Sequence, residues 1–514
     1  MSVRIGRCTN FRRCEAADRW QVISIPDANS FVCPRCNEKL VEVRDSLHDE
    51  VAKPGGYGSG VGLKLLVSAV VILVGIACVV GWQKFSGAKA AGASGAQHTI
   101  LRLAGSNTIG DEMGPSLAEA FLKGQGASDV HIVAGANPQE KMVLGTLPGD
   151  GAPSVITIAA HGSATAFTAM AANNCDIGMA SRKIKPEEAN TLTSLGDMTA
   201  PASEHIVGLD GIAVIVNSAN PIDQLDKDHI RQLFTGEIKD WSQAGPFSGT
   251  VKIYARNDNS GTYDTFKSLV LAGKPLASGA QRIEDSQTLS EAVAADPKAI
   301  GFIGLPYIQS AKPLAVSDQG TLSLLPTRLT VGTEDYLFSR RLYLYTSANS
   351  TNKYVRQFVE FALSKQGQDV VGASGFVAQN VVAQAQTVAE NAPEEYKRLT
   401  KDANRLSLDF RFQSGQAVLD NKAMVDLGRV VSLIADLKYS GDKIMLFGFA
   451  DGKGGLQANE SLSLSRAKTV ESLFIQRGLK PAVVRGYGSG VAVASNDTDE
   501  GKGKNRRVEI WMKN

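Results

Sequence analysis

The sequence has little net charge, few cysteines and few aromatic residues for its length. Its 514 residues carry 54 Lys and Arg against 52 Asp and Glu, a formal net charge of +2. A nucleic-acid-binding domain is normally strongly basic, so this balance argues against bulk nucleic-acid binding. Six cysteines are too few for a disulfide scaffold of this size, and no repeat of fixed period is present. A composition of 43% hydrophobic and 21% charged residues indicates instead a globular chain with room for two or three domains.

One run of the sequence, residues 65–83, contains no charged residue. As a helix it spans about 28 Å, close to the thickness of the bilayer core. Lys64 and Lys84 flank the run, and Trp82 occupies the place of an interfacial aromatic residue. A buried core helix is one alternative, and a signal peptide cleaved near residues 88–90 is another.

We therefore predict a single transmembrane helix over residues 62–83. Residues 1–53 hold nine Lys and Arg, whereas only Lys84 and Lys89 follow the helix closely. Near the membrane the counts are even, so the positive-inside rule only leans towards a cytoplasmic N-terminus. The expected arrangement is a single-pass inner-membrane protein with most of the chain in the periplasm.

Composition and patterning divide the chain into six parts. In order, these are a cysteine-bearing module (1–45), the transmembrane helix (62–83), an Ala/Gly/Ser-rich linker (84–98), a large α/β segment (99–384), a second linker (385–403) and a compact α/β unit (404–514).

In the large segment, a strand pattern leads three times into a turn of Gly, Ser and Thr that a helical pattern follows. The turns are residues 105–108, 162–165 and 256–262. Helix N-termini present unpaired N–H groups, hydroxyls add donors and glycine allows close approach, so such turns can bind a small oxyanion. Ordinary N-capping explains any one of them. Three turns together with Arg182 and Arg256 favour an anion site.

Residues 99–384 resemble the phosphate-type periplasmic solute-binding proteins of ABC importers. The resemblance rests on residues 105–108, 175–182, 232–241 and 256–262. It implies a type II-like fold, in which two α/β lobes close around one anion that pairs with an arginine held by an aspartate. The implied contacts are Ser106, Asn107, Thr108, Ser163, Ser181, Arg182, Arg256, Asp258, Ser260, Gly261 and Thr262, with Arg256 and Asp258 as that pair.

One position departs from part of the family. Arg182 stands where some relatives carry an aspartate that accepts a proton from protonated phosphate and so rejects sulfate. Asp258 is a second potential acceptor unless Arg256 occupies it. Phosphate is the expected ligand, and selectivity against sulfate stays open. We expect no catalysis, because His161 lies beside Ser163 without a base–orienter arrangement.

Residues 404–514 show the pattern of a small α+β domain. Alternation predicts strands at 405–412, 443–449 and 508–512, and helical spacing predicts helices at 420–437 and 458–477. The second helix places Asn459, Ser463 and Arg466 on the same side as its apolar residues. A buried arginine needs a partner, and Asp451 is the natural candidate. A purely structural ion pair would produce the same pattern.

This segment resembles the OmpA-like peptidoglycan-binding domain at residues 448–451, 459–467 and 505–510. The resemblance implies that Asp451 binds the ammonium, and Arg466 the carboxylate, of diaminopimelate in cell-wall stem peptides. Asn459 and Arg506 would support the site. Ala450 replaces a threonine that many relatives carry.

The N-terminal module contains a typical metal-knuckle spacing at Cys33 and Cys36. Together with Cys8 and Cys14, these thiols can supply one tetrahedral zinc site, and the module resembles a zinc ribbon. A redox pair and bystander cysteines are the alternatives. No organic cofactor is expected.

These observations predict a membrane-anchored, non-enzymatic protein that binds phosphate or a related oxyanion and attaches to peptidoglycan. An ABC importer permease is a further expected partner. The alternative is a structural envelope tether or sensor with a degenerate solute site.

Overall fold

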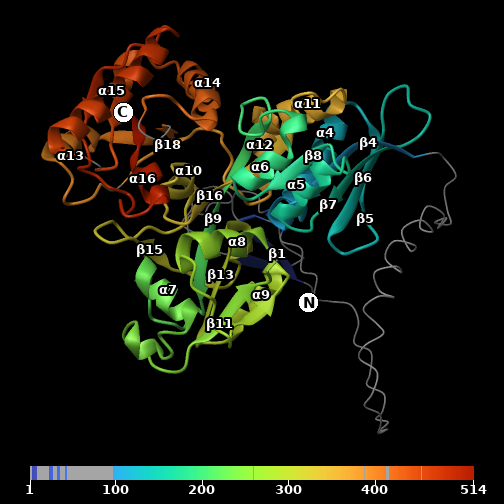
Figure 1. Ribbon diagram of the computed structural model, residues 1–514, viewed down its shortest axis with the longest axis horizontal. Coiled ribbons are helices and arrows are strands. Elements are labelled where there is room, and N and C mark those ends of the chain that lie inside the picture. Colours follow the sequence, from blue (N-terminus) through green and yellow to red (C-terminus); the bar gives the residue numbers. More distant parts are fainter. Residues whose placement is uncertain are drawn as a thin grey trace. The chain divides into compact units, whose positions relative to one another are not determined.

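In a computed structural model, the chain forms two compact units, residues 1–96 and 97–514 (Figure 1). The structure describes residues 3–7, 22–26, 32–34, 41–42, 97–258, 260–386, 388–412, 416–452 and 454–513. In the first unit, β1 (Val3–Arg7) pairs antiparallel with both β2 (Val22–Pro26) and β3 (Val41–Glu42). The predicted transmembrane helix lies outside the described residues. Among those that are described, no helix has the length and apolar character needed to cross a membrane.

An eleven-stranded sheet runs through the large α/β segment, in the order β12-β11-β13-β9-β16-β8-β4-β7-β6-β5 with β14 on β9. Its strands are β4 (His98–Gly105), β5 (Ser128–Ala134), β6 (Glu140–Thr146), β7 (Ser154–Ala159), β8 (Ile177–Ala180), β9 (Glu204–Val216), β11 (Lys252–Arg256), β12 (Gln281–Ile283), β13 (Ala299–Gly304), β14 (Lys312–Pro313) and β16 (Ser339–Thr346). A separate parallel pair consists of β10 (Gln224–Asp226) and β15 (Ala315–Ser317).

Helices pack on this sheet in both halves of the segment (Figure 1). They are α3 (Asn107–Gly110), α4 (Met113–Gly124), α5 (Ser163–Ala171), α6 (Pro186–Thr191), α7 (Lys227–Thr235), α8 (Gly261–Phe266), α9 (Ser286–Ala295), α10 (Arg328–Gly332), α11 (Lys353–Leu363) and α12 (Lys365–Ala373). The long strand β9 is buried over almost its whole length, because it reads as a near-continuous apolar run.

Two strands, β9 and β16, cross between two lobes. β9 pairs with β16 up to residue 211 and with β13 from residue 212 onwards. We call residues 97–208 and 342–380 lobe 1, and residues 212–338 lobe 2. Each lobe has its own apolar core. In lobe 2, the rings of Phe266 and Phe302 stack with centroids 3.9 Å apart. The predicted two-lobed α/β fold is confirmed.

The C-terminal domain contains a five-stranded sheet in the order β17-β18-β21-β19-β20. Its elements are β17 (Ala383–Gln384), α13 (Glu394–Thr400), β18 (Ala403–Arg411), α14 (Asn421–Asp436), β19 (Ile444–Gly448), α15 (Leu456–Ile475), β20 (Val483–Gly486), α16 (Asp499–Asn505) and β21 (Arg507–Lys513). These include all five elements that the sequence pattern predicts.

The structure corrects the prediction that residues 385–403 are a linker. This segment contains α13, and the Tyr396 ring of that helix is 2% exposed in a cluster with Phe447 and Trp511. The Tyr396 hydroxyl donates a 2.6 Å hydrogen bond to Glu509. The surrounding polar residues concealed this buried aromatic anchor, and the segment packs as part of the C-terminal domain.

Candidate functional site

The three predicted turns follow the carboxyl ends of β4, β7 and β11, where open α/β sheets bind their ligands. Ser106 precedes α3, Ser163 begins α5, and Ser260 precedes α8. The Ser260 hydroxyl accepts hydrogen bonds from the backbone N–H groups of Thr262 and Tyr263, at 3.2 and 3.4 Å. N-capping therefore accounts for Ser260. It does not account for Ser106, whose side chain makes no capping bond.

The turns meet at the boundary between the lobes. The hydroxyl oxygens of Thr108 in lobe 1 and Thr262 in lobe 2 lie 3.4 Å apart. Ser163 and Ser181 of lobe 1 share a 3.1 Å hydrogen bond. A Cβ on Gly261 of lobe 2 would stand 2.2 Å from the Ser181 hydroxyl oxygen and 2.7 Å from that of Ser163. Only glycine fits there, so the lobes are in closed contact.

Two arginines are buried at this boundary. Arg256, at the end of β11, is 4% exposed, and Arg340, near the start of β16, is 6% exposed. The Nη2 of Arg340 donates to the hydroxyls of Thr262 at 2.9 Å and Thr108 at 3.2 Å, which joins the two lobes. Burial lowers the pKa of Arg256, and the positive charge of Arg340 acts in the same direction.

Several buried polar atoms at this boundary have no hydrogen-bond partner among the described residues. They include Ser106 Oγ, Arg256 Nε and Arg340 Nη1. An unsatisfied buried donor costs about 1–3 kcal/mol, and more when it is charged. An oxyanion would supply acceptor atoms, and its negative charge would match the guanidinium of Arg256, which has no ion pair among the described residues of the kind that Arg340 makes with Asp210. The boundary therefore has the chemistry of an anion site.

Sequence reasoning missed Arg340 and its partner Asp210. Nε and Nη2 of Arg340 donate to the same Asp210 oxygen, at 3.0 and 2.6 Å, and both side chains are almost fully buried. Asp210 stands in the otherwise apolar run GLDGIAVIV, and Arg340 lies near the start of SRRLYLYT, just before an apolar and aromatic run. A charge in such a run needs a partner when it is buried, and this was the available signal.

Three predicted contacts have their side chains engaged elsewhere. Arg182 forms an ion pair with Glu188 at 2.6 Å and reaches across the lobe boundary to Asp264, 3.6 Å away. Asn107 donates to the Ala160 carbonyl. The Asp258 carboxylate is 80% exposed and pairs with another arginine of lobe 2.

This geometry corrects the expectation that Asp258 bonds to Arg256. Asp258 accepts a hydrogen bond from Arg282, and Arg282 also donates to the backbone carbonyl of Arg256 at 2.7 Å. The Arg256 side chain instead donates to the hydroxyl of Ser286. The surface carboxylate therefore acts on Arg256 only through Arg282 and the backbone.

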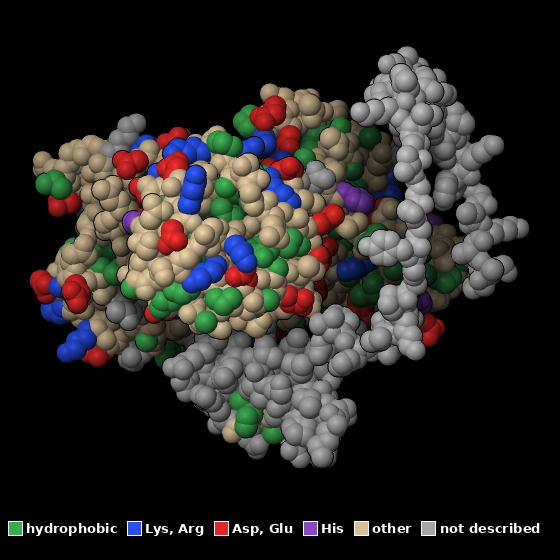
Figure 2. All heavy atoms as spheres, turned by 90° about the horizontal axis from the view of Figure 1, so that it is seen from below, with side chains coloured by type: hydrophobic (Ala, Val, Ile, Leu, Met, Phe, Trp, Pro, Cys, Tyr) green, Lys and Arg blue, Asp and Glu red, His purple; other side chains and the backbone are tan. Residues whose placement is uncertain are grey.

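The face shown in Figure 2 does not present a broad positive patch for an anion. On the face shown in Figure 2, basic and acidic side chains of the described residues are interspersed. Long-range steering needs an excess of one sign around a cleft. This face therefore shows no excess of positive charge that would steer an anion, in contrast to the buried guanidinium groups at the lobe boundary.

The C-terminal domain brings its predicted site residues together at one end of α15. Asp451 pairs with Arg506 at 3.0 Å. Arg466, which is 1% exposed, donates to the Phe449 carbonyl at 3.2 Å, and Asn459 donates to a backbone carbonyl of the loop after Asp451. Burial lowers the pKa of Arg466 to about 10, and the Asp451 charge opposes that shift. A carboxylate and a guanidinium in this arrangement can bind a zwitterionic group.

Comparison with known proteins gives a match for both segments. Residues 123–366 match the PBP superfamily domain, and residues 411–506 match the OmpA family. The phosphate-binding protein PstS of Staphylococcus aureus (strain bovine RF122 / ET3-1) is 30% identical over 307 residues, which cover 58% of this chain and 88% of that protein. The chain belongs to the PstS family of solute-binding proteins.

A second PstS relative, from Staphylococcus saprophyticus, is 28% identical and covered over 90% of its length. A solved ABC-type phosphate transport receptor from Vibrio cholerae aligns with a TM-score of 0.42 at 19% identity, over 54% of this chain and 99% of that one. The relatives are named as binding or transport proteins. With its OmpA-family domain, the chain is an envelope-associated member of the PstS family.

The predicted zinc site falls mostly outside the described residues. Cys33 is described and is 1% exposed, whereas Cys8, Cys14 and Cys36 are not described. Cys175 is buried in an apolar cluster of lobe 1, and burial raises the pKa of its thiol to about 12. The zinc site stays a prediction.

Proposed function

We propose that this chain is a membrane-anchored periplasmic binding protein that captures phosphate, or a similar oxyanion, between its two lobes. The observation that carries the proposal is the set of buried atoms without partners, Ser106 Oγ, Arg256 Nε and Arg340 Nη1. Hydroxyls and guanidinium groups at a closed lobe boundary replace the water shell of an anion, and charge-assisted hydrogen bonds are the strong ones. The names of the PstS relatives support phosphate as the ligand.

The second half of the proposal is attachment to peptidoglycan through the C-terminal domain. Asp451 takes the ammonium group and Arg466 the carboxylate of diaminopimelate, while Asn459 and Arg506 support them. The closeness of Asp451 and Arg506 and the OmpA-family match support this assignment. Captured phosphate then passes to an ABC importer permease, and zinc bound by the N-terminal cysteines stabilises a cytoplasmic module.

Titration calorimetry of the full-length chain tests the anion site. We expect phosphate to bind the wild type and to lose most of its affinity in Arg256→Gln, because the substitution removes a buried charge that faces the anion. Arg485→Gln is the matched control, since Arg485 is half-exposed in the C-terminal domain. Sulfate run in parallel measures selectivity. A wild type that binds no oxyanion would contradict the proposal and favour a structural envelope tether or a sensor with a degenerate solute site.

A further inference from the structure

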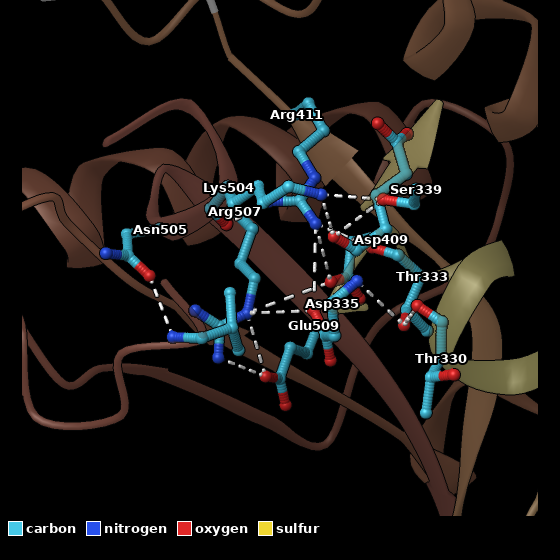
Figure 3. A network of polar contacts seen from close by, with 12 residues as sticks. Thr330, Thr333, Asp335, Ser339, Asp409, Arg411, Lys504, Asn505, Arg507 and Glu509 are labelled. Atoms are coloured by element: carbon cyan, nitrogen blue, oxygen red, sulfur yellow. Dashed lines mark hydrogen bonds and ion pairs between the residues drawn. The ribbon is translucent and has the colours of Figure 1, made fainter. Parts of the chain in front are cut away.

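Three arginines of the C-terminal domain converge on one carboxylate of the solute-binding domain. Two of them, Arg411 and Arg507, are labelled in Figure 3. That carboxylate belongs to Asp335, which lies just before β16 and is 2% exposed. Arg405 approaches it to 2.7 Å, Arg411 to 3.7 Å and Arg507 to 4.0 Å. The arginines hold the pKa of Asp335 below its usual value, although burial alone would raise it. The two domains therefore share one buried ionic network.

Two carboxylates of the C-terminal domain complete this network. Asp409 accepts two hydrogen bonds from Arg405, at 2.7 and 2.8 Å, and Glu509 accepts two from Arg507, at 2.6 and 3.0 Å. Buried charges are tolerated when they are paired in this way, and removal of one partner leaves the others uncompensated. The docking of the domains is thus specific in position and not a loose surface contact.

The C-terminal domain binds the strand that carries Arg340 through polar contacts on both sides of that residue. Lys504 donates to the Ser339 hydroxyl at 2.6 Å, and Asp420 pairs with Arg341 at 2.7 Å. Successive residues of a strand point to opposite faces. Arg340, between these two residues, points to the other side and bonds the hydroxyls of both lobes at the anion site. The first residues of β16 are therefore bound by the C-terminal domain on one face and by the two lobes on the other.

The same domain also contacts each lobe directly. Asn421 donates to the Thr199 carbonyl of lobe 1 at 3.0 Å. The backbone N–H of Ser495 donates to the Asp318 carboxylate of lobe 2 at 2.9 Å. Next to it, Ala494 is fully buried in the apolar core of lobe 2.

Further contacts reinforce both lobes. Arg429 donates a 3.0 Å hydrogen bond to Gln379 of lobe 1, and the Asp335 network belongs to lobe 2. We name the contacts of Asn421 and Arg429 the lobe 1 arm, and the contacts at Asp318 and Asp335 the lobe 2 arm.

We propose that the C-terminal domain is a clamp that holds the two lobes closed over the anion site. Both arms and the contacts of the C-terminal domain with β16 are formed while the lobes touch each other. Rotation about β9 and β16 would carry the lobes apart, and a rigid domain could then keep only one arm. Docking consequently favours the closed state, and a ligand that binds this state is bound more tightly when the clamp is in place.

Substitutions that remove the arm contacts in the full-length chain test the clamp. Asn421→Ala combined with Arg429→Gln removes the lobe 1 arm, whereas Asp318→Ala removes only part of the lobe 2 arm and leaves the Asp335 network. All three residues are only partly buried, so the fold should persist. Spin labels are introduced through genetically encoded ketone residues at the positions of Glu187 in lobe 1 and Glu284 in lobe 2, both exposed. This labelling leaves the native cysteines intact. Pulsed electron paramagnetic resonance then measures the distance between the lobes without ligand.

We expect one short distance in the wild type and in the control Arg485→Ala. The lobe 1 arm variant Asn421→Ala/Arg429→Gln should add a population at longer distance, because a clamp docked only on lobe 2 no longer spans the lobes. Asp318→Ala should add less, since the Asp335 contacts remain. Phosphate affinity should fall about 5-fold or more in the lobe 1 arm variant. An unchanged distance distribution in that variant would overturn the clamp. A wild type that binds no phosphate contradicts the proposed function instead, while the distances still decide the clamp.

Discussion

Asp210 and Arg340 lie directly opposite each other on the two strands that cross between the lobes, and Arg340 donates two hydrogen bonds to the Asp210 carboxylate, at 3.0 and 2.6 Å. The Asp210 carboxylate also accepts the backbone N–H of Leu305 at 3.0 Å. This pair fixes the Arg340 guanidinium at the crossing point, with Nη2 on the hydroxyls of both lobes and Nη1 without a partner among the described residues. The pair thus joins the stability of the hinge to the chemistry of the anion site.

The two roles of this pair can be separated by a double-mutant cycle. Arg340→Gln leaves the Asp210 charge buried and unpaired, so we expect the free energy of unfolding to fall by about 3–5 kcal/mol. Adding Asp210→Asn removes that uncompensated charge and should recover part of the lost stability. Phosphate affinity should stay low in the double variant, because Nη1 and Nη2 are still missing. Urea unfolding and calorimetry measure the two quantities. Recovery of affinity together with stability would show that Arg340 does not face the anion.

Closure of the lobes depends on the absence of a side chain at Gly261. In Gly261→Ala, the new Cβ would meet the hydroxyls of Ser181 and Ser163 at 2.2 and 2.7 Å, so the lobes cannot reach their present contact. We expect phosphate affinity to fall by at least a factor of about ten, which corresponds to about 1.4 kcal/mol. Thermal stability should change little, since an open arrangement relieves the clash.

Gly279→Ala provides the matched control. Gly279 lies in the same lobe, and a Cβ placed there meets no atom within 4 Å among the described residues. Phosphate titration of both variants by calorimetry separates a steric effect at the lobe boundary from the general effect of an alanine. Equal affinities in Gly261→Ala and the wild type would mean that the anion is not bound in the closed contact.

Local sequence patterns were sufficient to predict most strands and helices that carry the site. The turns at Ser106, Ser163 and Ser260 follow strands because β-branched runs end at Gly, Ser or Thr before a helical period begins. The ion pair between Arg182 and Glu188 could also have been noticed, since the two residues are only six positions apart. Such features depend on neighbours along the chain.

The contacts that the sequence did not reveal join distant residues. Asp210 and Arg340 are 130 positions apart, and Asp335 and Arg405 are 70 positions apart. No local period connects them, and each alone reads as a charge on a strand or loop. The fold decides which charges become neighbours, because a buried charge is stable only beside its partner. For the same reason, the sequence could not predict that the C-terminal domain docks on β16.

Wall binding should depend on the charge of Asp451. Asp451→Asn keeps the shape of the side chain but removes the negative charge that would hold an ammonium group. We expect sedimentation with purified peptidoglycan to be lost, while phosphate affinity stays within about a factor of two, since sites without shared contacts act almost independently. Lys468→Gln, at an exposed position of the same helix α15, is the control and should sediment like the wild type. If Asp451→Asn still sediments with peptidoglycan, the Asp451–Arg506 pair has only a structural role.

Acid should destabilise the solute-binding domain through His205. Burial lowers the pKa of this residue to about 4, from an ordinary value of 6.5, and its Nε2 lies 3.0 Å from the Thr346 hydroxyl. Between these two pH values the unfolded chain binds a proton that the folded chain does not. The contribution to stability is therefore complete above pH 6.5 and falls as the pH drops towards 4, by about 3 kcal/mol at most.

The substitution His205→Gln removes this titration and keeps a side chain that can bond Thr346. Urea unfolding followed between pH 7 and pH 4 should show a shallower loss of stability in His205→Gln than in the wild type. The variant has less stability to lose because neither its folded nor its unfolded state gains a proton at this position. His131→Gln, at an exposed position of β5, controls for the loss of a histidine as such. Parallel pH profiles of His205→Gln and the wild type would mean that His205 is hydrated and titrates normally in the folded protein.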